Sequence, residues 1–170
     1  MRIVFVDGYN VLNSWPELRD IISYDIDAAR KKLIEIMQNY SSYKEYKVII
    51  VYDAYSCKES VQRKDKIGAN LEVVFTKEGE TADSYIERTV ACIGRKYEVF
   101  VVTSDNLEQQ LIFGRGAVRV PSMEFYFEVK EIEKIISTKV IKKSSNKKNL
   151  LSDRISKDIF DKLDEMRKSK

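Results

Sequence analysis

The sequence predicts an α/β fold, in which helices cover both faces of a five-stranded parallel sheet to form a Rossmann-like, three-layer sandwich, followed by a C-terminal helix. Two patterns carry this prediction. Short, nearly continuous apolar runs recur along the chain, and segments with the apolar period of a helix lie between them. The 170 residues are 44% hydrophobic, which suits one domain with a true core plus an appendage.

Five runs rich in β-branched and aromatic residues have the length of buried strands. They cover residues 3–6, 48–52, 71–75, 99–102 and 117–120. Because crossovers between parallel strands are right-handed, we expect these strands, numbered in chain order, to lie in the order 3-2-1-4-5. A ligand then meets the carboxyl ends of the strands between strands one and four, where the winding direction reverses.

Helices are predicted where apolar residues recur with a helical period, over residues 26–40, 82–96, 106–113 and 122–137. Residues 138–149 are polar and basic without any period, which predicts a linker. Apolar residues return at helical spacing in the last segment, at Leu151, Ile155, Ile159, Leu163 and Met166. The predicted organisation is therefore a domain over residues 1–137, a linker over 138–149 and an amphipathic helix over 150–170. We expect this helix to dock on its own domain, although its pattern fits docking on a partner as well.

Composition excludes several kinds of site. The sequence has no histidine, so a Ser-His-Asp triad, an imidazole base and a His-ligated zinc site are excluded. Cys57 and Cys92 lie far apart without a CxxC partner, which fits neither a thiolate metal site nor a disulfide framework. The amino terminus lacks the pattern of a signal peptide and no apolar run has membrane-spanning length, so we expect a cytoplasmic protein without a membrane partner.

The charge of the chain is unevenly distributed. The whole sequence carries 30 basic and 27 acidic side chains, whereas residues 139–170 alone carry 11 basic and 5 acidic ones. The remaining residues are net acidic, with 19 basic and 22 acidic side chains. A basic tail of this kind adds sequence-independent attraction to phosphate, which allows a nucleic-acid partner without demanding one.

Four aspartates occupy the ends of predicted strands or the start of a predicted helix: Asp7, Asp53, Asp83 and Asp105. Since parallel strands end at one edge of a sheet, these side chains can converge although they are far apart in sequence. Gathered carboxylates repel one another unless a divalent cation neutralises them, and oxygen ligands favour Mg²⁺ or Mn²⁺. The chemistry expected is attack of metal-activated water on a phosphodiester of a nucleic acid. Taken singly, each aspartate equally fits a helix cap or a turn.

Asp7 carries the strongest case, because it directly follows a buried strand and precedes Gly8 and Asn10. Glycine permits close backbone approach at this point. The Asn10 amide can hold a phosphate or orient a metal-bound water.

Polar side chains one helical turn further along extend two of these positions. Glu87 shares a helix face with Asp83, and Gln109 shares one with Asp105. Together with Asp53, they are candidates for outer ligands or substrate contacts. A solvated surface position fits Glu87 as well.

Four motifs carry a resemblance to a known family. They are VDGYNVLNSW at residues 6–15, VYDAYS at 51–56, VVFTKEGETADSYIE at 73–87 and VTSDNLEQQLIFGRGAVRVPSMEF at 102–125. Over roughly residues 1–137, the chain resembles the YacP-like branch of the NYN domain family, which is similar to PIN nucleases.

The resemblance implies a PIN-like fold and a metal-dependent endoribonuclease. The acidic positions of the family fall on Asp7, Asp83 and Asp105, which would hold Mg²⁺ or Mn²⁺, and Asn10 is the polar partner of the first. Members of this branch are linked to cleavage of mRNA on the ribosome. The resemblance therefore also implies mRNA and the ribosome as partners.

Basic side chains are concentrated between the second and third predicted strands, in YSCKESVQRKDKIGAN at residues 55–70. A basic arm beside an acidic pocket suits RNA, because cations follow the backbone while the pocket holds the scissile phosphate. The candidates for RNA contacts are Tyr55, as a stacking ring, and the basic residues Lys58, Arg63, Lys64, Lys66, Lys77, Arg115 and Arg119. Charged loops that are only solvated fit the same pattern.

The sequence therefore favours a cytoplasmic endoribonuclease in which Asp7, Asp83 and Asp105 bind Mg²⁺ or Mn²⁺ and Asn10 positions water or phosphate. Two other classes stay open. One is an RNA- or ribosome-binding module of the same fold with little or no catalytic activity, and the other is a phosphatase acting on small phosphate esters. The long basic arm favours a polymer over a small substrate.

Overall fold

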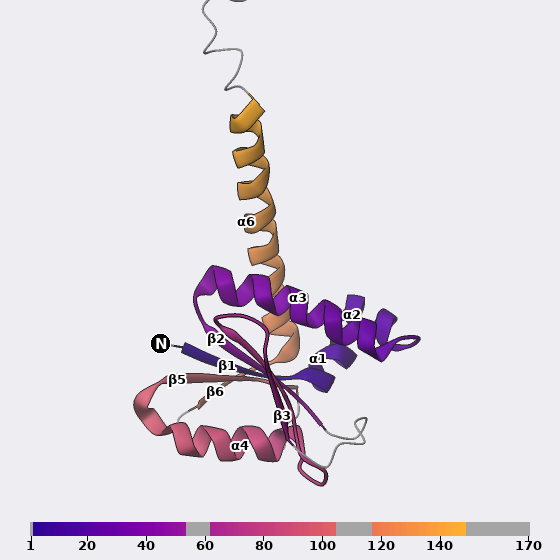
Figure 1. Cartoon of the computed structure of the whole chain (residues 1–170), viewed down its shortest axis with the longest axis vertical. Coiled ribbons are helices and arrows are strands. Elements are labelled where there is room, and N and C mark those ends of the chain that lie inside the picture. The colour runs from indigo at the N-terminus through magenta and orange to yellow at the C-terminus, as the bar shows by residue number, and fades with distance from the viewer. Residues whose placement is uncertain (1, 54–61, 105–116, 149–170) are drawn as a thin grey trace, which may run out of the picture. The chain divides into compact units, whose positions relative to one another are not determined.

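The computed structural model describes residues 2–53, 62–104 and 117–148, with side chains as far as residue 139 (Figure 1). The strands in these ranges are β1 (Arg2–Asp7), β2 (Lys47–Tyr52), β3 (Arg63–Lys66), β4 (Leu71–Phe75), β5 (Glu98–Val102) and β6 (Ala117–Val120). The helices are α1 (Gly8–Ser14), α2 (Pro16–Ile22), α3 (Ile26–Lys44), α4 (Ala82–Ile93), the 3-10 turn η2 (Gly94–Lys96) and α6 (Ser122–Lys148).

The strands form one sheet in the order β3-β4-β2-β1-β5-β6. Apart from β3, the paired strands run parallel, and their order is the one that the sequence predicts. Helix α3 lies on one face of this sheet and α4 on the other (Figure 1). The predicted α/β sandwich is therefore confirmed.

The sheet has one more strand than the five predicted. Strand β3 runs antiparallel to β4 at the edge of the sheet, with Arg63 opposite Phe75 and Lys66 opposite Glu72. Its four residues are all charged, so neither an apolar run nor an alternation marks it in the sequence. Charged side chains suit an edge strand because they discourage pairing with another chain.

One layer of the core lies between the sheet and α4. Phe5 of β1 and Val51 of β2 belong to this layer. Because side chains alternate along a strand, Asp7 and Asp53, two positions further, face the same side of the sheet as α4. Helix α4 buries its own apolar side chains in the same layer: Tyr85, Ile86 and Val90.

The core on the other face includes apolar side chains of α3 and the aromatic residues around Trp15. Trp15 is buried, and its indole Nε1 donates a hydrogen bond of 3.0 Å to the carbonyl oxygen of Ser122. Its ring packs against Phe125 and Tyr126 of α6. The sequence assigns these aromatic side chains no function, and the structure places Trp15 and Phe125 in the core.

Two short helices, α1 and α2, are missing from the sequence prediction. Each has seven residues, which is too few to show a helical period. Local signals do explain their starts: the side chain of Asp7 caps α1, and Pro16 stands in the first turn of α2.

The long helices differ from their predicted bounds at their C-terminal ends. Helix α3 continues to Lys44 and stops where Glu45 adopts a left-handed conformation, with φ of 57°. Helix α4 stops at Ile93, because Gly94 has φ of 62°, and the turn η2 takes the last three residues of the predicted span. The helix predicted over residues 106–113 lies outside the described residues.

Helix α6 continues to Lys148, whereas the sequence predicts an end at Ser137 and a linker over 138–149. No glycine or proline interrupts this span, and lysine is a good helix former, so nothing in the sequence stops the helix where its apolar period fades. By its contacts the chain divides into two units, Met1–Ile132 and Glu133–Lys170. The helix predicted over 150–170 lies outside the described residues. In the part of the chain that the structure describes, no helix is both long and apolar enough to cross a membrane.

Candidate active site

Several predicted site residues lie at the carboxyl edge of the sheet, where neighbouring parallel strands end. Strands β1 and β2 are adjacent and end at Asp7 and Tyr52, next to Asp53. Strand β5, on the other side of β1, leads to Ser104. Helix α4 begins close by, because the backbone N–H of Ala82 donates a hydrogen bond to the carboxylate of Asp53.

Asp7 is a half-buried carboxylate at the end of β1. It accepts backbone hydrogen bonds from Asn10, at 3.1 Å, and from Tyr9, both in the first turn of α1. Burial, the largest cause, and the negative charges of Asp83 and Asp53 together raise the pKa of Asp7 to about 6, while the two backbone N–H groups oppose the rise. Asp7 and Asp83 therefore lie within range of each other's electrostatic field.

Asp53 holds the start of α4 against the end of β2. Its bond from Ala82 supplements the cap from Thr81, whose hydroxyl accepts a 3.2 Å bond from the backbone N–H of Ser84. Burial raises the pKa of Asp53, and the charge of Asp83 adds to this effect. The contact fixes the first turn of α4, which carries the half-buried Asp83.

Asn10 connects the ends of β1 and β5. Its side-chain oxygen Oδ1 accepts a 3.0 Å hydrogen bond from the backbone N–H of Ser104, and its own backbone N–H donates to Asp7. The position predicted for a polar partner of Asp7 is thus also a link between two neighbouring strand ends. Asp105, the residue after Ser104, lies outside the described residues.

The carboxylates of this edge fit a divalent cation. Asp7 and Asp83 offer hard oxygen ligands, and bound Mg²⁺ or Mn²⁺ would offset the burial and the repulsion from Asp83 that disfavour the ionised form of Asp7. Within the ranges that the structure describes, no group of three acidic or cysteine side chains could hold a metal ion. The third predicted ligand, Asp105, belongs to a segment outside those ranges, as does Gln109.

Gly8 shows why glycine follows Asp7. A Cβ atom at this position would collide with Cε1 of Tyr52, so the backbone of the turn packs directly on that ring. Tyr52 is fully buried, and its ring makes an edge contact with Tyr9. The sequence predicts close backbone approach at Gly8 but does not indicate that Tyr9 and Tyr52 support the site, because Tyr52 ends an apolar run and has the pattern of a core residue.

The predicted RNA contacts are spread over several elements. Because β3 runs antiparallel, Arg63 lies nearest the carboxyl edge and Lys66, opposite Glu72, lies towards the amino ends of the parallel strands. The expectation that the basic arm of residues 55–70 lies beside the acidic pocket is therefore wrong for Lys66. Lys64 lies over the ring of Tyr85, with Nζ 5.7 Å from its centroid.

Two further basic candidates lie beyond β3. Lys77 is exposed in the turn that follows β4, at the carboxyl edge. Arg119 of β6 instead donates a 3.2 Å hydrogen bond from Nε to the carbonyl oxygen of Thr103, which secures the end of β5.

Glu87 is half-buried on α4, one turn after Asp83. The other candidates lie outside the described residues: Tyr55, Lys58 and Arg115.

The fold and the acidic edge match one family. The model of the YacP-like NYN domain matches residues 4–168. The chain therefore belongs to the YacP-like NYN domain family, whose domain is of the PIN-like nuclease type, and the prediction of this family is confirmed.

Individual relatives agree with this assignment. The chain is 40% identical to the protein YacP of Bacillus subtilis (strain 168) over 148 residues, which cover 86% of each protein. A crystal structure of Rae1 (YacP) from Bacillus subtilis superposes with a TM-score of 0.76 at 37% identity, covering 99% of this chain and 96% of that one. A second crystal structure, of a tryptophan-to-leucine mutant of Rae1, gives a TM-score of 0.72 at 39% identity, covering 84% of this chain and 83% of that one.

Proposed function

We propose that this protein is a metal-dependent endoribonuclease that hydrolyses phosphodiester bonds in mRNA, in association with the ribosome and in the cytoplasm. The observation that carries the proposal is the pair Asp7 and Asp83. They are carboxylates that come from different elements at the edge of a nuclease-family sheet, and the charge of Asp83 is one of the causes that raise the pKa of Asp7. Folding alone does not favour such a pair, whereas binding a cation does.

In this proposal Asp7 and Asp83, together with Asp105, hold Mg²⁺ or Mn²⁺. The bound ion would lower the pKa of a water molecule and neutralise charge on the scissile phosphate. Asp53 keeps Asp83 in place through the start of α4, and Asn10, whose side-chain oxygen accepts from the backbone N–H of Ser104, would use its amide NH₂ group to orient the water or a phosphate oxygen. Exposed cations such as Lys77 and Arg63 would bind the RNA backbone on either side.

The mRNA and the ribosome enter the proposal through the resemblance to the YacP-like branch and through charge. The 11 basic side chains of residues 139–170 supply sequence-independent attraction to a polyanion. A small phosphate ester would gain little from a tail of this kind, which is why RNA is preferred as the substrate.

The test is incubation of the purified full chain with naked and with translated mRNA, in Mn²⁺ or in EDTA, followed by mapping of the RNA ends. We expect cuts that need Mn²⁺, that are lost in the variant Asp7→Asn, and that depend on translation. A matched control is Asp25→Asn, because Asp25 also caps a helix, accepting bonds of 2.9 Å from Asp27 and Ala28, but at the exposed start of α3.

Three outcomes contradict parts of the proposal. RNA binding without metal-dependent cutting by the wild type identifies a binding module of the same fold. Cutting that persists in Asp7→Asn excludes Asp7 from the site. Equal cutting of naked and translated mRNA removes the ribosome from the mechanism.

A further inference from the structure

Arg30 of α3 lies in a nearly closed aromatic site behind the turn that carries Asp7. Its guanidinium carbon is 5.4 Å from the ring centroid of Tyr9, 5.5 Å from that of Tyr52 and 5.8 Å from that of Phe75. Only 12% of its side chain is exposed. Because Arg30 comes from a different element than each ring, it joins α3 to α1, β2 and β4.

The directional contact of Arg30 within this cluster is made with Tyr9. Its Nη2 donates a hydrogen bond to the hydroxyl of Tyr9, and its Nη1 pairs at 2.8 Å with Asp27 on the outer side. The Nε atom of Arg30 and the hydroxyl of Tyr52 are buried and have no hydrogen-bond partner among the described residues. The bond to Tyr9 is therefore the contact through which Arg30 can set the position of a neighbouring ring.

Tyr9 links the Asp7 carboxylate to the buried ring of Tyr52. The backbone N–H groups of Tyr9 and Asn10 both donate to the carboxylate of Asp7. The Tyr9 ring packs on Tyr52 with centroids 5.3 Å apart, and Tyr52 packs on the backbone at Gly8. A displacement of the Tyr9 ring would therefore move the two N–H groups that orient Asp7.

We propose that Arg30 is a positioning residue of the nuclease site. By holding Tyr9 against Tyr52 it fixes the first turn of α1, and with it the orientation of the Asp7 carboxylate and of Asn10. This inference rests on the proposed function, because the carboxylate is positioned for a divalent cation and an RNA phosphate. Lysine cannot replace Arg30 here, since its ammonium lacks the planar fork that bonds Asp27 and Tyr9 while lying against the rings.

The test compares Arg30→Lys and Tyr9→Phe, which remove the same hydrogen bond from opposite sides. Mn²⁺ binding to the purified full chain is measured by calorimetry, and kcat and KM are measured with an RNA substrate. We expect each variant to bind Mn²⁺ about tenfold more weakly, as happens when the partners that orient metal ligands are removed. We expect kcat to fall about tenfold with KM changed less than about twofold. The double variant should bind Mn²⁺ and cut RNA no less well than the more impaired of the two single variants, because both substitutions remove the same hydrogen bond.

The amino end of β1 offers a matched control. There Arg2 donates a 2.7 Å hydrogen bond to the hydroxyl of Tyr46 and lies over the rings of Tyr46 and Phe100. Arg2→Lys and Tyr46→Phe make the same chemical changes in a similar cluster away from Asp7, and should leave Mn²⁺ affinity and kcat unchanged.

The inference is overturned if Arg30→Lys and Tyr9→Phe bind Mn²⁺ as tightly as the wild type, or if the control variants weaken binding equally. Should Arg30→Lys fail to melt cooperatively, Tyr9→Phe, which keeps the ring, decides the question. A wild type that binds Mn²⁺ but does not cut RNA refutes the proposed function, while the affinities still decide the role of Arg30. A wild type that does not bind Mn²⁺ refutes both.

Discussion

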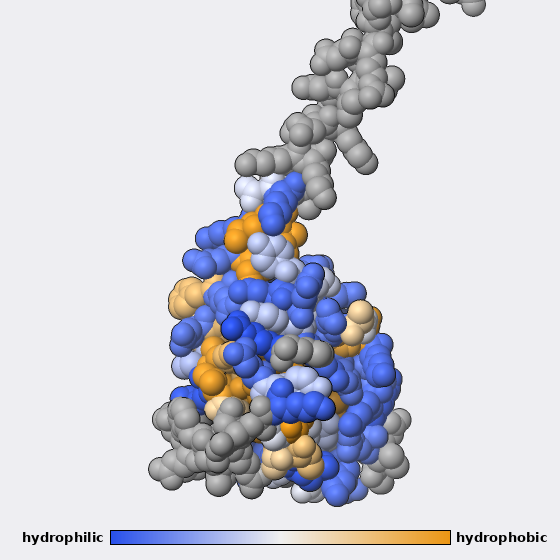
Figure 2. Space-filling view, turned by 90° about the vertical axis from the view of Figure 1, so that its left-hand side faces the viewer, coloured by the Kyte–Doolittle hydropathy of each residue, from blue (hydrophilic) through white to orange (hydrophobic). Residues whose placement is uncertain are grey.

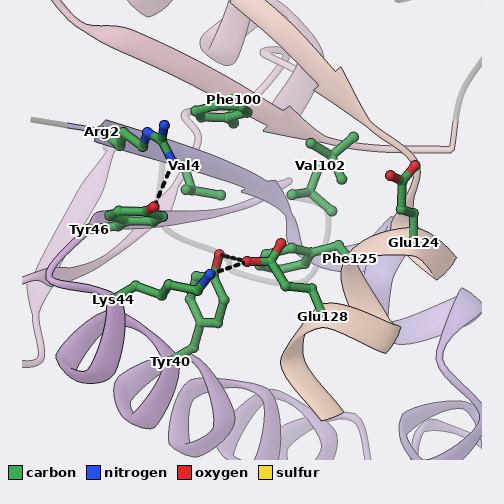
Figure 3. A pocket seen from close by; sticks show the side chains of 11 residues that line it. Arg2, Val4, Tyr40, Lys44, Tyr46, Phe100, Val102, Glu124, Phe125 and Glu128 are labelled. Carbon is green, nitrogen blue, oxygen red and sulfur yellow. Dashed lines mark hydrogen bonds and ion pairs between the residues drawn. The ribbon is translucent and has the colours of Figure 1, made fainter. Parts of the chain in front are cut away.

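An arginine bonded to a tyrosine hydroxyl lies at each end of strand β1, but the charges around the two ends differ. At the amino end, Arg2 pairs with Glu98 at 2.5 Å and with the hydroxyl of Tyr46, beside a cavity of about 230 Å³ (Figure 3). At the carboxyl end, the half-buried Asp7 lies near the like charges of Asp83 and Asp53. An arginine with a tyrosine supports both ends, but at the amino end Arg2 has an opposite charge as its partner, whereas at the carboxyl end Asp7 faces charges of its own sign.

The pKa values express this difference. Hydrogen bonds from Arg2, first to Glu98 and then to Tyr46, raise the pKa of Arg2 and so favour its charged form. Burial raises the pKa of Asp7, which disfavours its charged form. The face of the molecule that lies on the left in Figure 1, where β1 begins, is mostly hydrophilic with several hydrophobic patches (Figure 2). Ionised Asp7 at the carboxyl end lowers the stability of the folded protein, and such unfavourable charges are typical of ligand-binding sites.

The largest expected effect is the loss of cleavage on substituting Asp7. Asp7→Asn keeps a side chain that can cap α1 but removes the charge, so we expect the Mn²⁺-dependent rate to fall by about a thousandfold. The measurement is the initial rate of RNA cutting at saturating Mn²⁺. A rate within about tenfold of the wild type, with Asp25→Asn unaffected, would show that the buried charge at this end is not needed for the chemistry.

The same variant should be more stable than the wild type at neutral pH. The folded pKa of Asp7, about 6, exceeds its unfolded value of 3.8, so the group favours folding most below about pH 4, and this contribution is lost as pH rises through about 6. The gain in unfolding free energy of Asp7→Asn over the wild type should therefore grow from near zero at about pH 4 to about 3 kcal/mol at about pH 7.

Urea denaturation in EDTA at several pH values measures this difference. The chelator matters, because a bound divalent ion would stabilise the ionised carboxylate and remove the effect. A difference that does not change between about pH 4 and about pH 7 would mean that burial and repulsion at Asp7 are weaker than the structure indicates.

A smaller effect is expected from packing at the same end. Gly8→Ala places a methyl group against the buried ring of Tyr52, which cannot move into solvent. We expect a loss of about 1–3 kcal/mol in unfolding free energy, as for other overpacked cores. Unfolding in urea measures it, and the suitable control is Gly79→Ala, where nothing lies within 4 Å but φ is +81°. If Gly8→Ala costs less than this control, the close approach at Gly8 is not a constraint.

The smallest effect is expected at the amino end. Glu98→Gln removes the ion pair with Arg2, whose side chain is 45% exposed, and exposed pairs contribute little to stability. We expect melting temperature, Mn²⁺ affinity and cleavage to stay at wild-type values. A clear loss of cleavage in Glu98→Gln would show that the amino end of β1 affects the site at its carboxyl end, which contradicts the difference described between the two ends.

Much of the fold could be predicted because it depends on local patterns. The five parallel strands are apolar runs, and right-handed crossovers favour the order that is observed. The exceptions have local causes as well: β3 consists of charged residues, α1 and α2 are too short for a period, and α6 has no glycine or proline at the point where a linker was expected.

What the sequence determined by itself is the position of Asp7, Asp53 and Asp83 at the ends of particular elements, because each directly follows or begins a recognisable pattern. What only the tertiary structure decided is which side chains act on them. Arg30 is 23 positions from Asp7 on a charged helix, and no sequence pattern relates them. Their relation exists because α3, β2 and β4 bring a cation and two rings behind the turn, whose own Tyr9 supplies the third ring. Contacts of this kind depend on how the elements pack in three dimensions.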